Sequence, residues 1–138
     1  MKQLLAFSWT AVVAAACAGI FFPLAQAAEL TAQKSTQRGV TIAVTPQTIG
    51  GNASAWDFKV VLDTHSQDLS EDLMTSTLLV DASGRQHAPI AWKGAPPGGH
   101  HREGVLSFPP VRPAPASVEL RIQRPGEPQP RSFHWELP

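Results

Sequence analysis

The chain has 138 residues, with 11 basic and 11 acidic side chains, five histidines and one cysteine. This length allows one domain with a modest core, and the balanced charge argues against nucleic acid and anionic lipid surfaces as partners. A single cysteine excludes a disulfide within the chain.

Residues 1–27 have the pattern of a secretory signal peptide. Lys2 precedes a long apolar run, and the tripeptide "AQA" at 25–27 has the small residues that a signal peptidase accepts before its cut. We therefore predict cleavage after Ala27, a periplasmic mature chain without a membrane span, and no cysteine in it. Lipidation at Cys17 is the alternative, because "AAAC" resembles a lipobox, although the apolar run continues beyond that residue.

The mature chain alternates short apolar runs with turns rich in glycine and proline. Residues 28–38 are polar and without period, which predicts a flexible lead-in. The clearest strand covers residues 56–63, where Trp56, Phe58, Val60 and Leu62 fall on one face. Further strands are predicted over residues 40–46, 74–81, 86–92, 104–108, 117–123 and 132–137. Residues 39–138 therefore predict an all-β fold, an antiparallel, immunoglobulin-like β-sandwich of about seven strands.

Two histidine-bearing stretches are expected to meet at one end of this sandwich, "LDTHS" at 62–66 and "PPGGHHREG" at 96–104. Strands that alternate in direction bring the end of the first stretch beside the loop of the second. Imidazole nitrogens and carboxylate oxygens are ordinary ligands of Zn²⁺ and Cu²⁺, and two loop glycines free the backbone so that neighbouring histidines can aim at one point. The sequence thus predicts a Zn or Cu(II) site, with Glu103 or Arg102 orienting its ligands Asp63, His65, His100 and His101.

Other interpretations of these residues stay open. Asp63 can cap a turn, a carbonyl can hold His65, and the double histidine can pack on Trp92 or pair with Glu103. Asp63, His65 and Ser66 are residue types of a hydrolase, but they lie too close in sequence for a triad, and no "GxSxG" is present. We therefore predict no enzyme and no catalytic residue.

A calcium site is a further alternative for the acidic stretch Asp68, Glu71 and Asp72, although their spacing matches no known calcium loop. A solvated acidic turn is the simpler interpretation of the same residues.

The stretches "LDTHS" and "PGGHHREGVLSF" also carry a resemblance. The chain resembles a family of small exported bacterial all-β proteins of uncharacterised function, over roughly residues 38–137. The resemblance implies an exported all-β domain and transfers no catalytic residue. It implies these signature positions here: Asp63, Thr64, His65, Gly98, Gly99, His100, His101 and Arg102.

These observations predict an exported periplasmic binding module whose ligand is a divalent transition metal, Zn or Cu(II). The alternative is an envelope protein–protein interaction or structural module in which the histidine motifs are purely structural. An exposed sheet edge and the stiff segment "PPVRPAPA" at 109–116 would then contact the envelope protein partner.

Overall fold

The structure is a computed structural model, and it describes residues 30–138. The predicted signal peptide, the cleavage site and Cys17 lie outside the described residues. Within residues 30–138, no helix has the length and apolar character needed to cross a membrane.

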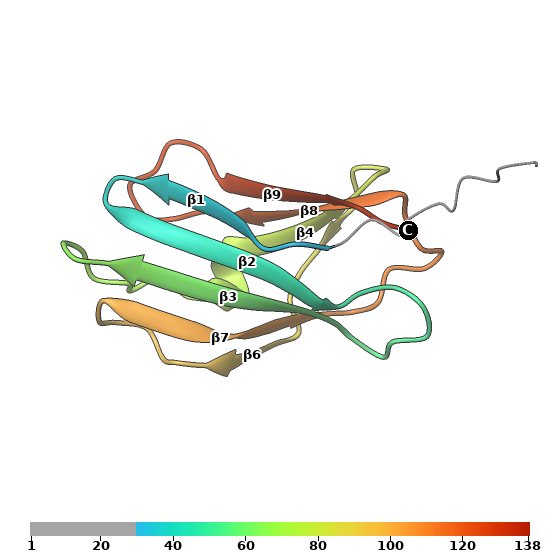
Figure 1. The fold of residues 1–138 in the computed structure, drawn as a ribbon, viewed down its shortest axis with the longest axis horizontal. Coiled ribbons are helices and arrows are strands. Elements are labelled where there is room, and N and C mark those ends of the chain that lie inside the picture. The colour runs from blue at the N-terminus through green and yellow to red at the C-terminus, as the bar shows by residue number, and fades with distance from the viewer. Residues whose placement is uncertain (1–29) are drawn as a thin grey trace, which may run out of the picture.

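Nine strands and one short helix build two antiparallel sheets that pack face to face (Figure 1). The five-stranded sheet has the order β1-β2-β3-β7-β6, and the four-stranded sheet has the order β5-β4-β8-β9. The elements are β1 (Gln33–Gln37), β2 (Val40–Thr48), β3 (Trp56–Thr64), α1 (Leu73–Ser76), β4 (Thr77–Asp81), β5 (Gln86–His87), β6 (Ala91–Gly94), β7 (His101–Phe108), β8 (Ser117–Ile122) and β9 (Arg131–Glu136).

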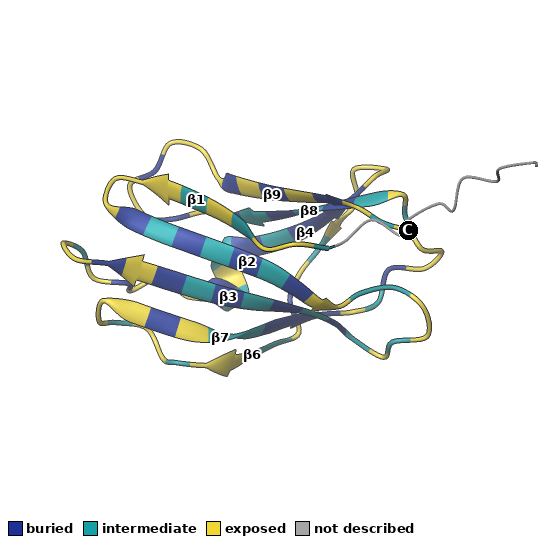
Figure 2. Cartoon of the chain, in the orientation of Figure 1, coloured by how far each residue is buried: buried dark blue, intermediate teal, exposed yellow. Residues whose placement is uncertain are grey.

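Alternating side chains decide which face of each strand lies inside. In β2 and β3 every second residue is buried, and the stripes of Figure 2 show this alternation along both strands. The inward faces of the two sheets meet in one apolar core, where Phe58 stands edge-on to Phe108, with ring centroids 5.7 Å apart, and lies 5.7 Å from the ring of Trp135. The predicted all-β antiparallel sandwich is therefore confirmed.

Three details differ from the sequence prediction. The predicted strand 86–92 is divided between the sheets, with β5 beside β4 and β6 beside β7. Residues 33–37 were expected within a flexible lead-in, but they form the edge strand β1, which pairs with β2 from Gln33↔Val44 to Gln37↔Val40. The carbonyls of Ser35 and Gln37 also accept hydrogen bonds from the buried guanidinium of Arg131. A polar segment without an apolar period thus becomes a strand because its backbone pairs with β2, while the side chains of Gln33 and Thr36 add hydrogen bonds to the backbone of His134 and to Thr41.

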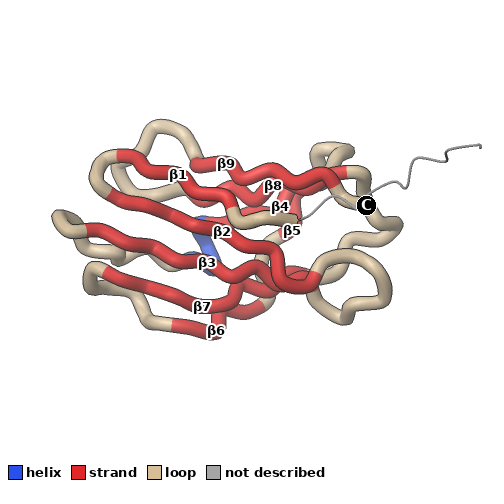
Figure 3. Tube along the Cα trace, viewed as in Figure 1, coloured by secondary structure: helices blue, strands red, loops and turns tan. Residues whose placement is uncertain are grey.

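The predicted strand 74–81 is shorter in the structure, because Leu73–Ser76 form the one-turn helix α1, capped by Asp72, and β4 begins only at Thr77. The side chain of Asp72 accepts a hydrogen bond from the backbone N–H of Met74, as an N-cap does. Figure 3 shows this helix behind β2 and β3 in that view, and its Leu73 is buried in the core.

One end of the sandwich, here called the histidine pole, collects four turns. They are the β1–β2 turn at 38–39, the stretch 65–72 after β3, the loop 95–100 before β7 and the β8–β9 turn at 123–130 (Figures 1 and 3). The C-terminus lies at the opposite end of the sandwich.

Candidate functional site at the histidine pole

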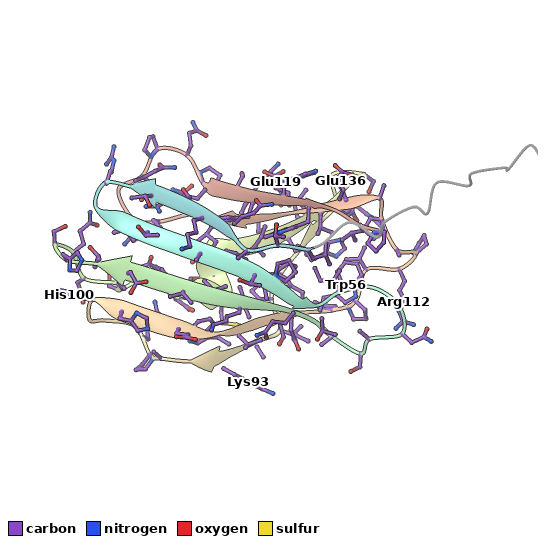
Figure 4. All side chains as sticks on the ribbon, viewed as in Figure 1. Trp56, Lys93, His100, Arg112, Glu119 and Glu136 are labelled. Carbon is purple, nitrogen blue, oxygen red and sulfur yellow. The ribbon has the colours of Figure 1, made fainter. Side chains whose placement is uncertain are left out.

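The two histidine-bearing stretches meet at this pole through their backbones. The N–H of Thr64 donates to the carbonyl of His100 at 2.9 Å, and the N–H of Leu69 donates to the carbonyl of Gly99 at 3.0 Å. The N–H of Gly98 returns a bond to the carbonyl of Leu69 at 2.8 Å. Figure 4 shows His100 at the tip of the pole. The predicted meeting of distant segments is thus present as a hydrogen-bonded junction.

Several polar residues of the two motifs form hydrogen bonds within this junction. The hydroxyl of Thr64 donates to the carbonyl of Gly39 at 2.9 Å and accepts from the N–H groups of Ser66 and Gln67. Asp68 accepts the N–H of Gly99 at 2.9 Å, and Gly99 adopts a φ of 75°, a backbone conformation that favours glycine. These contacts favour the structural interpretation for Thr64, Asp68 and Gly99.

A buried ionic cluster lies beneath the same pole, and sequence reasoning missed it. Its members are Glu71 after β3, Arg124 and Glu127 in the β8–β9 turn, and Arg131 at the start of β9, all nearly inaccessible to solvent. Arg131 donates to both oxygens of Glu127, at 3.0 and 2.6 Å, and Arg124 reaches Glu71 at 2.5 Å. Because each charge has an opposite partner, the cluster joins these turns beneath the pole.

Arg102 is buried separately, on the core side of β7. Its guanidinium donates to the carbonyls of Leu69 and Glu71, at 3.2 and 2.7 Å, and lies 5.8 Å from the ring centroid of Trp92. Arg102 therefore points away from the face that carries His101 and Glu103. The prediction that Arg102 orients metal ligands is wrong, because its side chain lies on the other side of the sheet.

The outer face of the five-stranded sheet carries a chain of four charged groups from β3 and β7. His101 lies directly opposite Asp63, and its Nδ1 is 2.5 Å from Oδ1 of Asp63. On the other side of the ring, Nε2 of His101 is 3.6 Å from Oε2 of Glu103, whose Oε1 pairs with Nζ of Lys59 at 2.6 Å. The side chains of His101, Asp63 and Glu103 are 58%, 55% and 46% exposed. These four side chains, Asp63, His101, Glu103 and Lys59, are accessible to solvent, contact one another and lie outside the apolar core.

The hydrogen bond that the His101 ring donates to Asp63, together with the charges of Asp63 and Glu103, raises the pKa of His101 above its ordinary value of about 6.5. Asp63 is the largest cause. The protonated His101 ring therefore stabilises the folded state. This stabilisation is present at pH values below the unfolded-state pKa of His101 and is lost as the pH rises through its folded-state pKa.

We expect NMR titration of the metal-free protein to give His101 a midpoint above about 6.5, and Asp63→Asn to lower that midpoint. His134→Ala, which removes a histidine from the other sheet, leaves the His101 curve unchanged. A midpoint at or below the ordinary value in the unaltered protein would contradict the arrangement.

The remaining two predicted ligands are placed nearby but are not engaged. His65 follows the last residue of β3 and His100 precedes the first residue of β7, and both are exposed. Across residues 30–138, neither ring forms a hydrogen bond or ion pair, and no three or more histidine, aspartate or glutamate side chains are grouped as a metal would require. His101 therefore has two carboxylate neighbours, but the four predicted ligands do not surround a common point.

The catalytic and calcium alternatives are not favoured by these contacts. Asp63 bonds to His101 instead of His65, and Ser66 contributes its N–H to the turn at Thr64. Asp68 and Asp72 each serve a backbone N–H, while Glu71 is buried against Arg124.

The chain was also compared with known proteins. No family model, curated protein or solved structure was found to match it.

Proposed function

We propose that the protein is an exported periplasmic binding module that holds a divalent transition metal, Zn²⁺ or Cu²⁺, on the outer face of β3 and β7. The supporting observation is the line of Asp63, His101 and Glu103, in which one carboxylate lies at each nitrogen of an exposed imidazole. Export itself is proposed from the signal-like residues 1–27.

The distances favour different roles for the two carboxylates. Two ligand atoms that share a tetrahedral ion at about 2.1 Å each are roughly 3.4 Å apart. The 3.6 Å between Nε2 of His101 and Oε2 of Glu103 is close to that separation, whereas the 2.5 Å between His101 and Asp63 is a hydrogen-bond distance. We therefore assign His101 and Glu103 as ligands and Asp63 as the residue that orients the ring.

Asp63 has a second effect in this arrangement. A carboxylate that accepts the Nδ1–H of a histidine fixes the tautomer that leaves Nε2 free, and it makes Nε2 a better donor to the metal. His101 must therefore lose its Nε2 proton, but not its Nδ1 proton, when the metal binds.

Calorimetric titration of the untagged protein with Zn²⁺ tests the proposal. We expect His101→Ala to abolish binding and Asp63→Asn to weaken it by about 10- to 100-fold, the usual loss when an orienting group is removed. Lys59→Met, which removes the cation that competes for Glu103, should strengthen binding by roughly two- to fivefold, as for an exposed ion pair.

A matched control lies on the other sheet. His134 and Glu136 are also two residues apart on one strand, they are 55% and 72% exposed, and Nε2 of His134 is 2.8 Å from Oε1 of Glu136. Within the described residues, Nδ1 of His134 has no carboxylate bonded to it. His134→Ala should leave Zn²⁺ affinity unchanged, and the proposal fails if this variant loses binding while His101→Ala retains it.

Protein contact is the second candidate function, and one observation favours it. Ile90, 56% exposed, is the large hydrophobic side chain that the described surface leaves open, and it immediately precedes the edge strand β6. This function predicts no response to Zn²⁺, together with a cross-linked envelope partner that Ile90→Asp no longer captures.

A further inference from the structure

The proposed metal site, formed by His101 and Glu103, is incomplete within one copy of the chain. His101 and Glu103 supply two ligand atoms, whereas Zn²⁺ in a stable protein site usually has four ligands. No group of three or more suitable side chains exists among residues 30–138 that would supply the others. The rest of the coordination shell must come from water or from another molecule.

The surroundings of the proposed metal site leave room for another molecule. His101 and Glu103 project from the sheet face and are about half exposed. On the adjoining strand β2, the residues opposite Asp63 and Val61 are Thr41 and Ala43, which have shorter side chains than the two ligands. A sheet face with protruding ligands and short neighbours can approach a second face of the same kind.

Charge also favours a second copy. One Zn²⁺ held by a single Glu103 carboxylate keeps one net positive charge, whereas two Glu103 carboxylates from two copies neutralise the ion. The cation Lys59 and the anion Asp63 lie on the same face, so two copies of this face do not meet as surfaces of one sign. Self-complementary contacts of this kind are what a symmetric dimer requires.

We infer that the metal joins two copies of the chain, with His101 and Glu103 of each copy completing a four-ligand Zn²⁺ site on a two-fold axis. This inference rests on the proposed function, and it adds the partner of the site: a second copy, held by the metal. The chain without metal is then a monomer, since the shared ion is the contact that fixes the pair.

Native mass spectrometry and sedimentation velocity with ZnCl₂ test the inference on the untagged protein. The expected result is a doubling of mass with one Zn²⁺ per two chains, reversed by a chelator and abolished in His101→Ala and in Glu103→Gln. His134→Ala, the matched control, should still form the dimer.

The outcomes separate this inference from the proposed function. One Zn²⁺ bound per monomer, without a change in mass beyond the ion, overturns the dimer and leaves the metal module standing. No bound Zn²⁺ at all overturns both. A His65→Ala, His100→Ala double variant that binds but no longer dimerises would also overturn the inference, because those imidazoles would then hold the pair together.

Discussion

Arg131→Met is expected to lower the free energy of unfolding by about 3–5 kcal/mol, measured by urea denaturation at pH 7. The variant removes the guanidinium that donates to both oxygens of Glu127 and to the carbonyls of Ser35, Gln37 and Val40. Glu127 is then a buried carboxylate whose one remaining ionic partner among residues 30–138 is Arg124, 3.5 Å away. An uncompensated buried charge is the costly part of such a loss.

The control for Arg131 is an exposed pair on the neighbouring strand. Arg121 donates to Glu119 at 3.1 and 3.0 Å, but both side chains are partly exposed to solvent. We expect Arg121→Met to cost less than about 1 kcal/mol. Equal losses in the two variants would mean that burial does not set the strength of these ion pairs.

The same cluster fixes a direction of pH dependence. The hydrogen bond from Arg131 holds the pKa of Glu127 below its usual value. The resulting stabilisation is present above the unfolded-state pKa of about 4.3 and is lost as the pH falls through the folded-state pKa. The stability difference between the unaltered protein and Arg131→Met should therefore shrink in acid.

Arg102→Met is expected to cost about 3 kcal/mol, because the carbonyl of Glu71 loses a charged donor at 2.7 Å inside the protein. The variant also removes the cation that lies over Trp92. Besides the loss in denaturation, we expect faster hydrogen exchange at the amides of Gly98 and Leu69, because Arg102 holds the stretch that these amides join.

Lys93→Met is the matched control for Arg102, since Lys93 lies on the adjacent strand β6 and points into solvent (Figure 4). A change within about 0.5 kcal/mol is expected there. If Arg102→Met behaves like Lys93→Met and leaves exchange at Gly98 unaltered, Arg102 does not hold the pole together.

The strands and their inward faces could be predicted from the sequence because period-two alternation is a local property. Trp56, Phe58, Val60 and Leu62 lie inside, as their spacing indicates. The meeting of residues 62–66 with residues 96–104 followed from alternating strand direction alone. The strand β1 could not be predicted, because its polar side chains carry no apolar period, and the buried Arg131 that holds its carbonyls is distant in sequence.

The buried arginines Arg102 and Arg131 show a second limit of prediction from the sequence. Charged residues are usually exposed, so Arg102 and Arg131 were not expected in the interior. A signal was present nevertheless: counting back by two from Phe133 places Arg131 on the inward face, and counting back from Leu106 places Arg102 there too. Their partners Glu127 and Glu71 depend on how the turns fold over them, which the strand pattern does not encode.

The candidate site was predictable as a location but not as an arrangement. Asp63 and His101 are in contact, but His65 and His100 belong to the irregular ends beside them, where no side-chain period applies. The sequence could not distinguish a ligand from an orienting carboxylate, since that depends on which nitrogen of His101 each acid faces.

The nitrogen resonances of the His101 ring test the proposed metal site most directly. In a long-range ¹H–¹⁵N correlation experiment with Zn²⁺ added, we predict a large shift of Nε2, while Nδ1 remains protonated and bonded to Asp63. Unchanged His101 resonances, or metal bound at Nδ1 with the bond to Asp63 broken, would contradict it.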